Sequence, residues 1–223
     1  VSTLMKPEIG AQFSQSGYWL VLLASSMLIS LLFTFTLLAC AAKDTFLTLQ
    51  YERNQDPLTR LLNRRAFFEL AEFNIRSVFK EQWAVIVCDI DHFKKVNDVW
   101  GHAVGDQVLK MVGESLLQQS RKGDLVARFG GEEFVILFQC RDSLTAHSVA
   151  QRMRMAIGQI QLQNVPVVLT ASFGVAMAEE KMLVEEVIAS ADNYLYQAKR
   201  AGRNQVCSET TDLCSGDINM VQV

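Results

Sequence analysis

Hydrophobic and polar positions follow two different patterns along the chain, and these divide it into an apolar N-terminal run and a mixed remainder. No charged residue occurs between positions 9 and 42, and residues 18–42 are nearly all apolar. A helix of that length is about what is needed to cross a hydrocarbon core of ~30 Å. Tyr18 and Trp19 supply interfacial aromatic rings at one end, and Lys43 ends the apolar run at the other.

Two other kinds of segment contain similar runs. A signal peptide has an apolar core of only ~7–15 residues after a positively charged start. Here the charge before the run is Lys6 against Glu8. A core helix so uniformly apolar would need burial on every side. We therefore expect a transmembrane helix over 18–42, with a short segment over 1–17 before it.

Basic residues after the apolar run indicate its orientation. They are Lys43, Arg53, Arg60, Arg64 and Arg65. Because Lys and Arg concentrate on the cytoplasmic side of membrane helices, the C-terminal portion is expected in the cytoplasm. A charged linker or helical stalk is expected over 43–55. The sequence leaves open whether further membrane or sensory segments precede Val1.

The rest of the chain alternates between helical and strand periodicity. Helices are expected over 64–80, 104–119, 143–160 and 183–201, and strands over 83–90, 125–129, 133–139 and 165–176. Gly130 and Gly131 make the second and third strands a hairpin. This order of elements predicts an α+β domain of the ferredoxin-like, split βαβ type over 56–207, with a mostly antiparallel central sheet. A polar tail follows over 208–223.

In that topology, the end of the first strand lies beside the start of the third. Asp89 and Asp91 close the first strand, and Glu132 and Glu133 open the third. Clustered carboxylates repel one another unless a cation or protons compensate them. Mg²⁺ commonly takes one or two carboxylates and completes its shell with water and substrate phosphates. The sequence predicts a metal site here, against the alternative of solvated acids at strand ends.

Groups suited to a nucleotide occur in the same part of the predicted fold. Residues 93–95 begin a helical turn whose free N–H groups can hold an anion. Asn97 and Asp106 offer an amide and a carboxylate, which match the edge of guanine. Lys199 and Arg203, four apart, can reach terminal phosphates together. Taken singly, such residues are more often caps, turns or solvated charges.

Charge and cysteine content limit the other functions. There are 21 Lys plus Arg against 24 Asp plus Glu, with a formal net charge of -3. This balance gives no general attraction for nucleic acid, so any phosphate must be held locally. The five cysteines lack paired metal-ligand spacing and are expected to be reduced thiols; Cys207 and Cys214 are close enough in sequence to consider a pair.

Over about 56–206, many short motifs resemble those of the GGDEF family of diguanylate cyclases. The matching residues are Asp56-Pro57-Leu58-Thr59, Leu61, Asn63-Arg64-Arg65, Asp89-Ile90-Asp91-His92-Phe93-Lys94, Val96-Asn97-Asp98, Gly101-His102, Gly105-Asp106, Arg128-Phe129-Gly130-Gly131-Glu132-Glu133-Phe134, Ser172-Phe173-Gly174-Val175-Ala176, Ala191-Asp192, Tyr194, Tyr196, Ala198-Lys199 and Gly202-Arg203-Asn204. Their number and order identify the chain as similar to that family.

The resemblance implies roles for the matching residues. Asp89, the Ile90 carbonyl and Glu132 would hold Mg²⁺, with Glu133 completing or tuning the site and Glu132 and Glu133 as the catalytic pair. Two metal ions per active site are implied, with Mn²⁺ able to substitute. The implied substrate-binding residues are Phe93, Lys94, Asn97, Asp106, Gly130, Gly131, Lys199 and Arg203. Among them, Asn97 and Asp106 would read guanine, and the Phe93 and Lys94 amides with Lys199 and Arg203 would hold the phosphates.

The family's reaction implies the partners. Each subunit binds one GTP, two subunits face each other, and each 3′-hydroxyl attacks the α-phosphate of the opposite GTP, releasing pyrophosphate. The product is cyclic di-GMP. The resemblance, together with the apolar run, implies a homodimer anchored in the bacterial inner membrane with its catalytic domain in the cytoplasm.

A further match concerns product inhibition. Arg121 and Asp124 have the spacing and position of the family's RxxD inhibition site, and Arg152 is a second arginine expected there. Glu132 stands where the family's naming motif has Asp, which keeps the carboxylate. Two alternatives remain open: an inactive receptor for GTP or cyclic di-GMP, and a membrane-tethered module that only dimerises.

Overall fold

The N-terminal unit of the chain is a long helix. The computed structural model describes residues 17–77, 82–162, 165–179 and 182–209. Helix α2 spans Gly17–Asn54, so the expected linker is helical up to Asn54. Within it, Trp19–Lys43 is long and apolar enough to cross a membrane, and no other helix among the described residues is. The expected segment over 1–16 lies outside the described residues.

The remaining described elements belong to a second unit, Asn54–Val223. They are β1 (Leu62–Asn63), α3 (Arg64–Ser77), β2 (Gln82–Ile90), α4 (Phe93–Trp100), α5 (His102–Gln119), β3 (Leu125–Gly130), β4 (Glu133–Cys140), α6 (Ser143–Gly158), β5 (Ala171–Met177), α7 (Val184–Arg200) and β6 (Val206–Ser208).

The strands form one sheet in the order β1-β3-β4-β2-β5-β6. Strand β2 lies in the interior and runs antiparallel to both neighbours, β4 and β5. The short strands β1 and β6 pair in parallel with β3 and β5. The predicted α+β fold is confirmed, including the placement of the third core strand against the first. In that pairing, Asp89 is the partner of Glu133.

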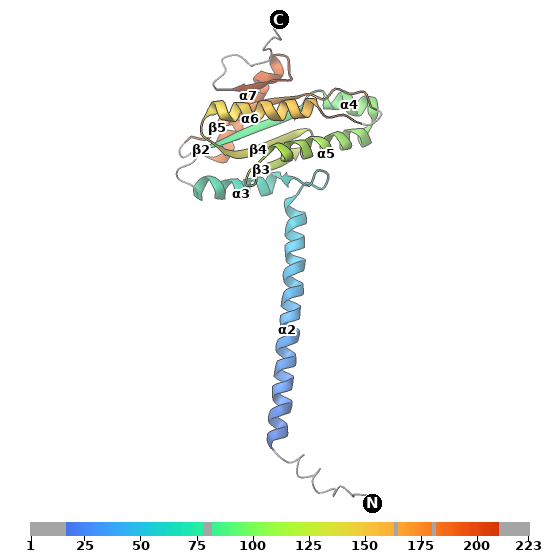
Figure 1. The fold of residues 1–223 in the computed structure, drawn as a ribbon, viewed down its shortest axis with the longest axis vertical. Coiled ribbons are helices and arrows are strands. Elements are labelled where there is room, and N and C mark those ends of the chain that lie inside the picture. Colours follow the sequence, from blue (N-terminus) through green and yellow to red (C-terminus); the bar gives the residue numbers. More distant parts are fainter. Residues whose placement is uncertain (1–16, 78–81, 163–164, 180–181, 210–223) are drawn as a thin grey trace, which may run out of the picture. The chain divides into compact units, whose positions relative to one another are not determined.

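Helices cover both faces of this sheet (Figure 1). Helices α4, α5 and α6 pack on one face, where β2 presents Ile86 and Cys88. Helices α3 and α7 pack on the other, where β2 presents Val85 and Val87. Burial on both faces explains why β2 is an unbroken apolar run rather than an alternating one. Polar residues can therefore enter β2 only at its end, where Asp89 lies.

Several boundaries differ from those predicted. Strand β5 begins at Ala171 rather than at 165, because Pro166 has no N–H and the preceding chain makes only an isolated bridge between Leu162 and Val165. Helix α4 is a full helix of 8 residues where a single turn was expected. Strands β1 and β6 have 2 and 3 residues, too few for a periodic pattern to be recognised.

The state of one cysteine also differs. Cys207 is buried on β6 and is disulfide-bonded. The expectation of reduced thiols is therefore wrong for this residue, because close spacing in the sequence carries no signal that distinguishes a bonded pair from two free thiols. Cys214, the cysteine nearest to it in sequence, lies outside the described residues.

A glycine sets the distance between α7 and the sheet. A Cβ on Gly174 of β5 would collide with the Ala191 carbonyl oxygen and the Leu195 nitrogen of α7. Backbone atoms cannot move aside as a flexible side chain can, so Gly174→Ala must displace the helix. We expect the free energy of unfolding to fall by about 1–3 kcal/mol, measured by urea denaturation.

Gly158→Ala is the matched control for this change. Gly158 lies in α6, and a Cβ there has nothing within 4 Å. Alanine is the better helix former, so the control should leave stability unchanged or raise it slightly. Equal stability of the two variants would contradict the close approach of α7.

Candidate functional site

Two acidic side chains meet a cation where β2 ends and β4 begins. Asp89 is only 6% exposed, and the N–H of the next residue, Ile90, donates to the Glu132 carbonyl oxygen at 3.3 Å. The Lys199 Nζ, from α7, lies 2.8 Å from Asp89 Oδ2. The structure thus brings together three of the predicted site residues from three distant parts of the sequence.

Burial raises the pKa of both carboxyl groups. For Asp89, desolvation outweighs the opposing effects of the Lys199 hydrogen bond and charge and of the Arg203 charge. For Glu132, desolvation is reinforced by the negative charges of Asp89 and Glu133 and opposed by Lys199. Acidic groups held close together and away from water are stabilised in their charged forms when a cation binds between them. The two carboxyl groups therefore have the electrostatic character of a cation site.

The donors present fit a magnesium ion. Mg²⁺ in nucleotide sites needs only one or two carboxylates, because water and phosphates supply its other ligands. Asp89, Glu132 and the Ile90 carbonyl would be the protein ligands. Throughout the described ranges, no three His, Cys, Asp or Glu side chains come together as a metal site. Glu133 is exposed and lines a separate hollow of about 310 Å³, so its role at the metal stays a prediction.

Asp91 has hydrogen-bond partners that its sequence position did not predict. Its Oδ1 accepts a hydrogen bond from the Ser172 hydroxyl at 2.7 Å. Its Oδ2 accepts from the Thr170 hydroxyl at 2.9 Å and from the Asn204 N–H at 3.0 Å. The charge of Asp91 also raises the pKa of Asp89, so Asp91 does lie near Asp89 as predicted, but three hydrogen-bond donors already satisfy its carboxylate. A buried carboxylate satisfied by three donors ties structural elements together.

The two residues predicted to read guanine lie on adjacent helices. Asn97 is on α4 and Asp106 is on α5. A Cβ on Gly105 would collide with Asn97 Oδ1, so the Asn97 side chain lies directly against the first turns of α5. The absence of a side chain at 105 therefore allows Asn97 to lie beside the helix that carries Asp106.

The residues predicted to hold phosphates surround the same end of β2. Phe93 and Lys94 begin α4, where the first N–H groups of a helix have no acceptor within it. Arg203 follows α7, and its charge partly opposes the rise in the pKa of Asp89. Gly130 and Gly131 form the hairpin tip with φ of 149° and 52°, the second of which favours glycine.

The hairpin is fixed by an ion pair whose role sequence reasoning did not assign. Arg128 Nη1 lies 3.1 Å from Asp56 Oδ1, and both side chains are largely buried. The same guanidinium donates to the Gly131 carbonyl oxygen from Nε at 3.0 Å and from Nη2 at 2.7 Å. Asp56 also accepts from the Thr59 N–H and hydroxyl. The hairpin tip is thereby tied to the start of the globular unit.

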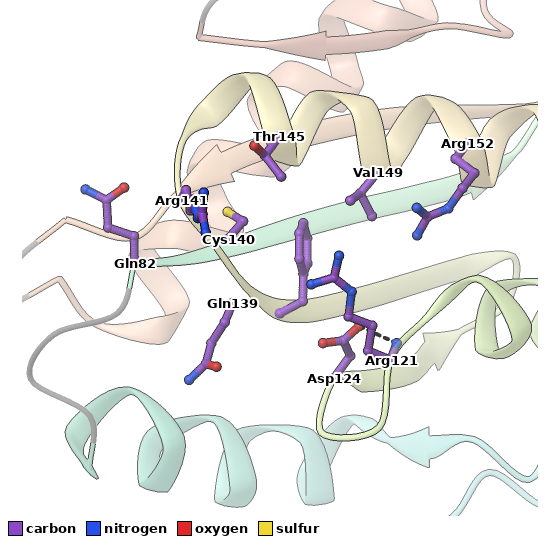
Figure 2. A pocket seen from close by; sticks show the side chains of 10 residues that line it. Gln82, Arg121, Asp124, Gln139, Cys140, Arg141, Thr145, Val149 and Arg152 are labelled. Atoms are coloured by element: carbon purple, nitrogen blue, oxygen red, sulfur yellow. Dashed lines mark hydrogen bonds between the residues drawn. The ribbon is translucent and has the colours of Figure 1, made fainter.

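The residues predicted for product inhibition line a second pocket of about 830 Å³ (Figure 2). Arg121 and Asp124 lie in the turn between α5 and β3, and the Arg121 N–H donates to Asp124 Oδ2 at 2.7 Å. Arg152 reaches in from α6, and its Nη2 donates to the Gln119 carbonyl oxygen at 2.8 Å. Phe138 of β4 also lines the pocket. One hollow thus contains all three predicted residues.

Comparison with protein families gives one match over most of the globular unit. The family described as diguanylate cyclase, GGDEF domain, matches residues 53–205. Among characterised sequences, the chain is 42% identical over 158 residues to the probable diguanylate cyclase DgcT of Escherichia coli (strain K12). That match covers 69% of this chain but 35% of the relative, so the chain spans about a third of the relative's length.

Solved structures agree with this match. The coiled coil and GGDEF domain of DgcB from Caulobacter crescentus, in complex with c-di-GMP, superposes with a TM-score of 0.73 at 28% identity. It covers 81% of this chain and 98% of that one. The active GGEEF domain of a diguanylate cyclase from Vibrio cholerae gives 0.63 at 28% identity, covering 68% of this chain and 99% of that one.

The Asp56–Arg128 pair should contribute measurably to stability. We expect a double-mutant cycle of Asp56→Ala and Arg128→Ala to give a coupling energy of about 1–3 kcal/mol in urea denaturation. Hydrogen bonds from Thr59 and Arg128 outweigh burial and lower the pKa of Asp56. The coupling should therefore persist above the ordinary pKa of an aspartate and disappear as the pH falls through the lowered value.

The exposed pair of Arg65 and Glu69 on α3 is the control, with side chains 39% and 62% exposed. Its coupling should not exceed about 0.5 kcal/mol. A coupling for Asp56 and Arg128 no larger than this one would show that the buried pair does not hold the hairpin.

Proposed function

The chain belongs to the GGDEF family of diguanylate cyclases, and on that premise we propose that it condenses two GTP molecules to cyclic di-GMP and pyrophosphate. The observation that carries the proposal is the meeting of Asp89, Glu132 and Lys199 at one end of β2. These groups supply acidic metal ligands and a phosphate-binding cation in one place.

In this proposal, the acidic residues bind the metal ions, and the basic residues bind the phosphates of the substrate. Asp89, Glu132 and the Ile90 carbonyl would bind two Mg²⁺ ions, for which Mn²⁺ can substitute. Bound metal would neutralise phosphate oxygens and stabilise the developing charge at the α-phosphate. Lys199 and Arg203 bind the terminal phosphates, and the free N–H groups of α4 add to that site.

The base is selected at the other end of the nucleotide. Asn97 and Asp106 present an amide and a carboxylate from adjacent helices. A carboxylate accepts hydrogen bonds from the guanine N1–H and 2-amino groups, which adenine cannot donate in that arrangement. Fixing both the base and the phosphates orients the α-phosphate and the 3′-hydroxyl, and such positioning supplies a large share of the rate enhancement.

Each globular unit has the residues to bind one GTP, whereas the product joins two. The reaction therefore requires two copies of the chain facing each other, so that each 3′-hydroxyl reaches the α-phosphate held by the partner. Helix α2 would anchor this homodimer in the inner membrane, since Trp19–Lys43 has the required length and composition.

The 830 Å³ pocket would bind the product and limit its synthesis. Arg121 and Arg152 supply guanidinium groups that can pair with guanine or phosphate, and Asp124 can accept from the base edge. Burial raises the pKa of Asp124, although the Arg121 hydrogen bond and the two arginine charges oppose this effect. A ligand that donates hydrogen bonds to Asp124 fits that environment.

Glu132 provides the test of the enzymatic reaction. The chain is incubated with GTP and Mg²⁺, and cyclic di-GMP is quantified by chromatography. Glu132→Ala should lower the rate by about 10²–10³-fold or more, because it removes a metal ligand and its charge. Glu114→Ala, at an exposed position on α5, is the control and should keep full activity. If the unmodified chain forms no product at dimer-forming concentrations, the proposed reaction is wrong.

Product inhibition is tested at Arg121. Arg121→Ala should raise the inhibition constant for cyclic di-GMP by about tenfold or more, because the product loses a hydrogen bond to a charged group. The initial rate should not change. Lys122→Ala, at the exposed neighbouring position, is the matched control. An inhibition curve shared by all three proteins would contradict the assignment of the pocket.

A further inference from the structure

The turn that carries Arg203 has an unusual backbone conformation. Gly202, Arg203 and Asn204 have φ of 119°, 67° and 47°. Gly202 adopts such values freely and Asn204 tolerates them better than most residues, whereas the side chain of Arg203 makes them unfavourable. Non-glycine residues stay in this region only where surrounding contacts hold them, and such positions concentrate at functional sites.

The first contact that holds the turn is the end of α7 itself. The Arg203 N–H donates to the Ala198 carbonyl oxygen at 3.0 Å, the hydrogen bond typical of a Schellman motif. Buried Gln205 donates from Nε2 to the same carbonyl at 2.7 Å. The Gln205 carbonyl oxygen in turn accepts from the Phe173 N–H at 2.9 Å, so both sides of Asn204 are held, and Asn204 lies between them.

Asp91 supplies the contact at that point. Its Oδ2 accepts the Asn204 N–H at 3.0 Å, although the two residues are 113 positions apart in the sequence. Asp91 is itself held firmly: the hydroxyls of Ser172 and Thr170 donate to it, and its own N–H donates to the Thr170 carbonyl oxygen. Asp91 is 6% exposed, so its end of the bond to Asn204 is buried, whereas Asn204 itself is exposed.

A second contact holds the same residue from the outside. Arg154 of α6 donates from Nη1 to the Asn204 carbonyl oxygen at 3.1 Å and to Asn204 Oδ1 at 2.8 Å. Its Nε donates to Gln151 Oε1, which fixes the guanidinium on its own helix. Asn204 is therefore held between buried Asp91 and half-buried Arg154, one residue after Arg203.

We propose that Asp91 is a positioning residue for Arg203: by accepting the Asn204 N–H, it holds the turn after α7 so that Arg203 faces the terminal phosphates of GTP. The inference rests on the proposed function and adds a role for the second acid of the Asp-x-Asp pair. Asp89 would bind the metal directly, whereas Asp91 acts through the backbone at 204. A long cationic side chain on a fixed turn loses less conformational freedom when it binds.

A change at Asp91 should affect the binding of nucleoside triphosphates but not that of monophosphates. When the acceptor at Asp91 is removed, the turn is no longer held in one conformation, and Arg203 binds the terminal phosphates more weakly. The guanine contacts on α4 and α5 do not depend on that turn. Nucleotides that lack β- and γ-phosphates should therefore bind as before.

The test uses the full chain and two nucleotides that cannot be cyclised: 3′-deoxy-GTP, which lacks the attacking hydroxyl, and GMP. Affinities are measured by calorimetry with Mg²⁺ present. Asp91→Ala should weaken 3′-deoxy-GTP binding by about tenfold or more and leave GMP binding unchanged. In an Arg203→Ala background, Asp91→Ala should cause no further loss, because the two residues act on one contact.

Conservative variants separate positioning from direct metal binding. The amide oxygen of Asp91→Asn can still accept the Asn204 N–H, and Ser172 can accept from the new amide, so this variant should retain most of the triphosphate affinity. A metal ligand would lose its function in the same variant. Ser172→Ala leaves the bond between Asp91 Oδ2 and Asn204 in place and should bind both nucleotides normally.

If Asp91→Ala does not fold, Arg154→Gln decides the question. It removes the hydrogen bonds from Arg154 to Asn204, and it should weaken 3′-deoxy-GTP binding several-fold without affecting GMP. Equal losses for both nucleotides, additive losses with Arg203→Ala, or wild-type affinity in the variant that folds would each overturn the inference. A wild-type chain that produces no cyclic di-GMP would instead overturn the proposed reaction.

Discussion

The buried carboxylate of Asp91 imposes a constraint on which the arrangement of the site depends. An ionised group shielded from water is tolerated only when donors satisfy it. Here the donors are Thr170 and Ser172, at the start of β5, and Asn204, in the turn after α7. Satisfying one side chain therefore joins the end of the central strand to two segments that are remote in sequence. The groups that would meet the substrate are built around this junction.

The double-sided burial of β2 explains why polar chemistry is confined to that end. Its side chains enter one core under α4, α5 and α6 and another under α3 and α7. A charge in the middle of the strand would be buried without a partner, at a cost of several kcal/mol or more. At its end, Asp89 finds Lys199 from a helix that Gly174 allows to approach closely. The fold thus fixes both where the acids lie and which cation reaches them.

Much of this fold follows from periodicity, and the parts that do not are those set by distant contacts. The sequence predicts β2 from its apolar run, the β3–β4 hairpin from its two glycines, and the helices from their apolar faces. The hydrogen-bond partners of Asp91 do not follow, because an acid two residues after Asp89 has the same sequence signal whether it faces metal or hydroxyl groups. The Arg128–Asp56 pair spans 72 positions, and no local pattern links its two members. Strands as short as β1 and β6 exist only because the neighbouring strand is already present.

The two proposed binding regions share one feature: in each, an arginine has its backbone or its guanidinium group fixed by hydrogen bonds in the structure without ligand. In the triphosphate region, Asp91 and Arg154 hold the residue after Arg203. In the RxxD pocket, the Gln119 carbonyl holds the Arg152 guanidinium, and Asp124 holds the Arg121 backbone. An arginine free in solvent loses about 2 kcal/mol of rotamer entropy when it is immobilised, and prior restraint removes part of that cost. Arg152 and Arg154 lie on the same helix two positions apart, so α6 restrains a cation in one region and the supporting turn in the other.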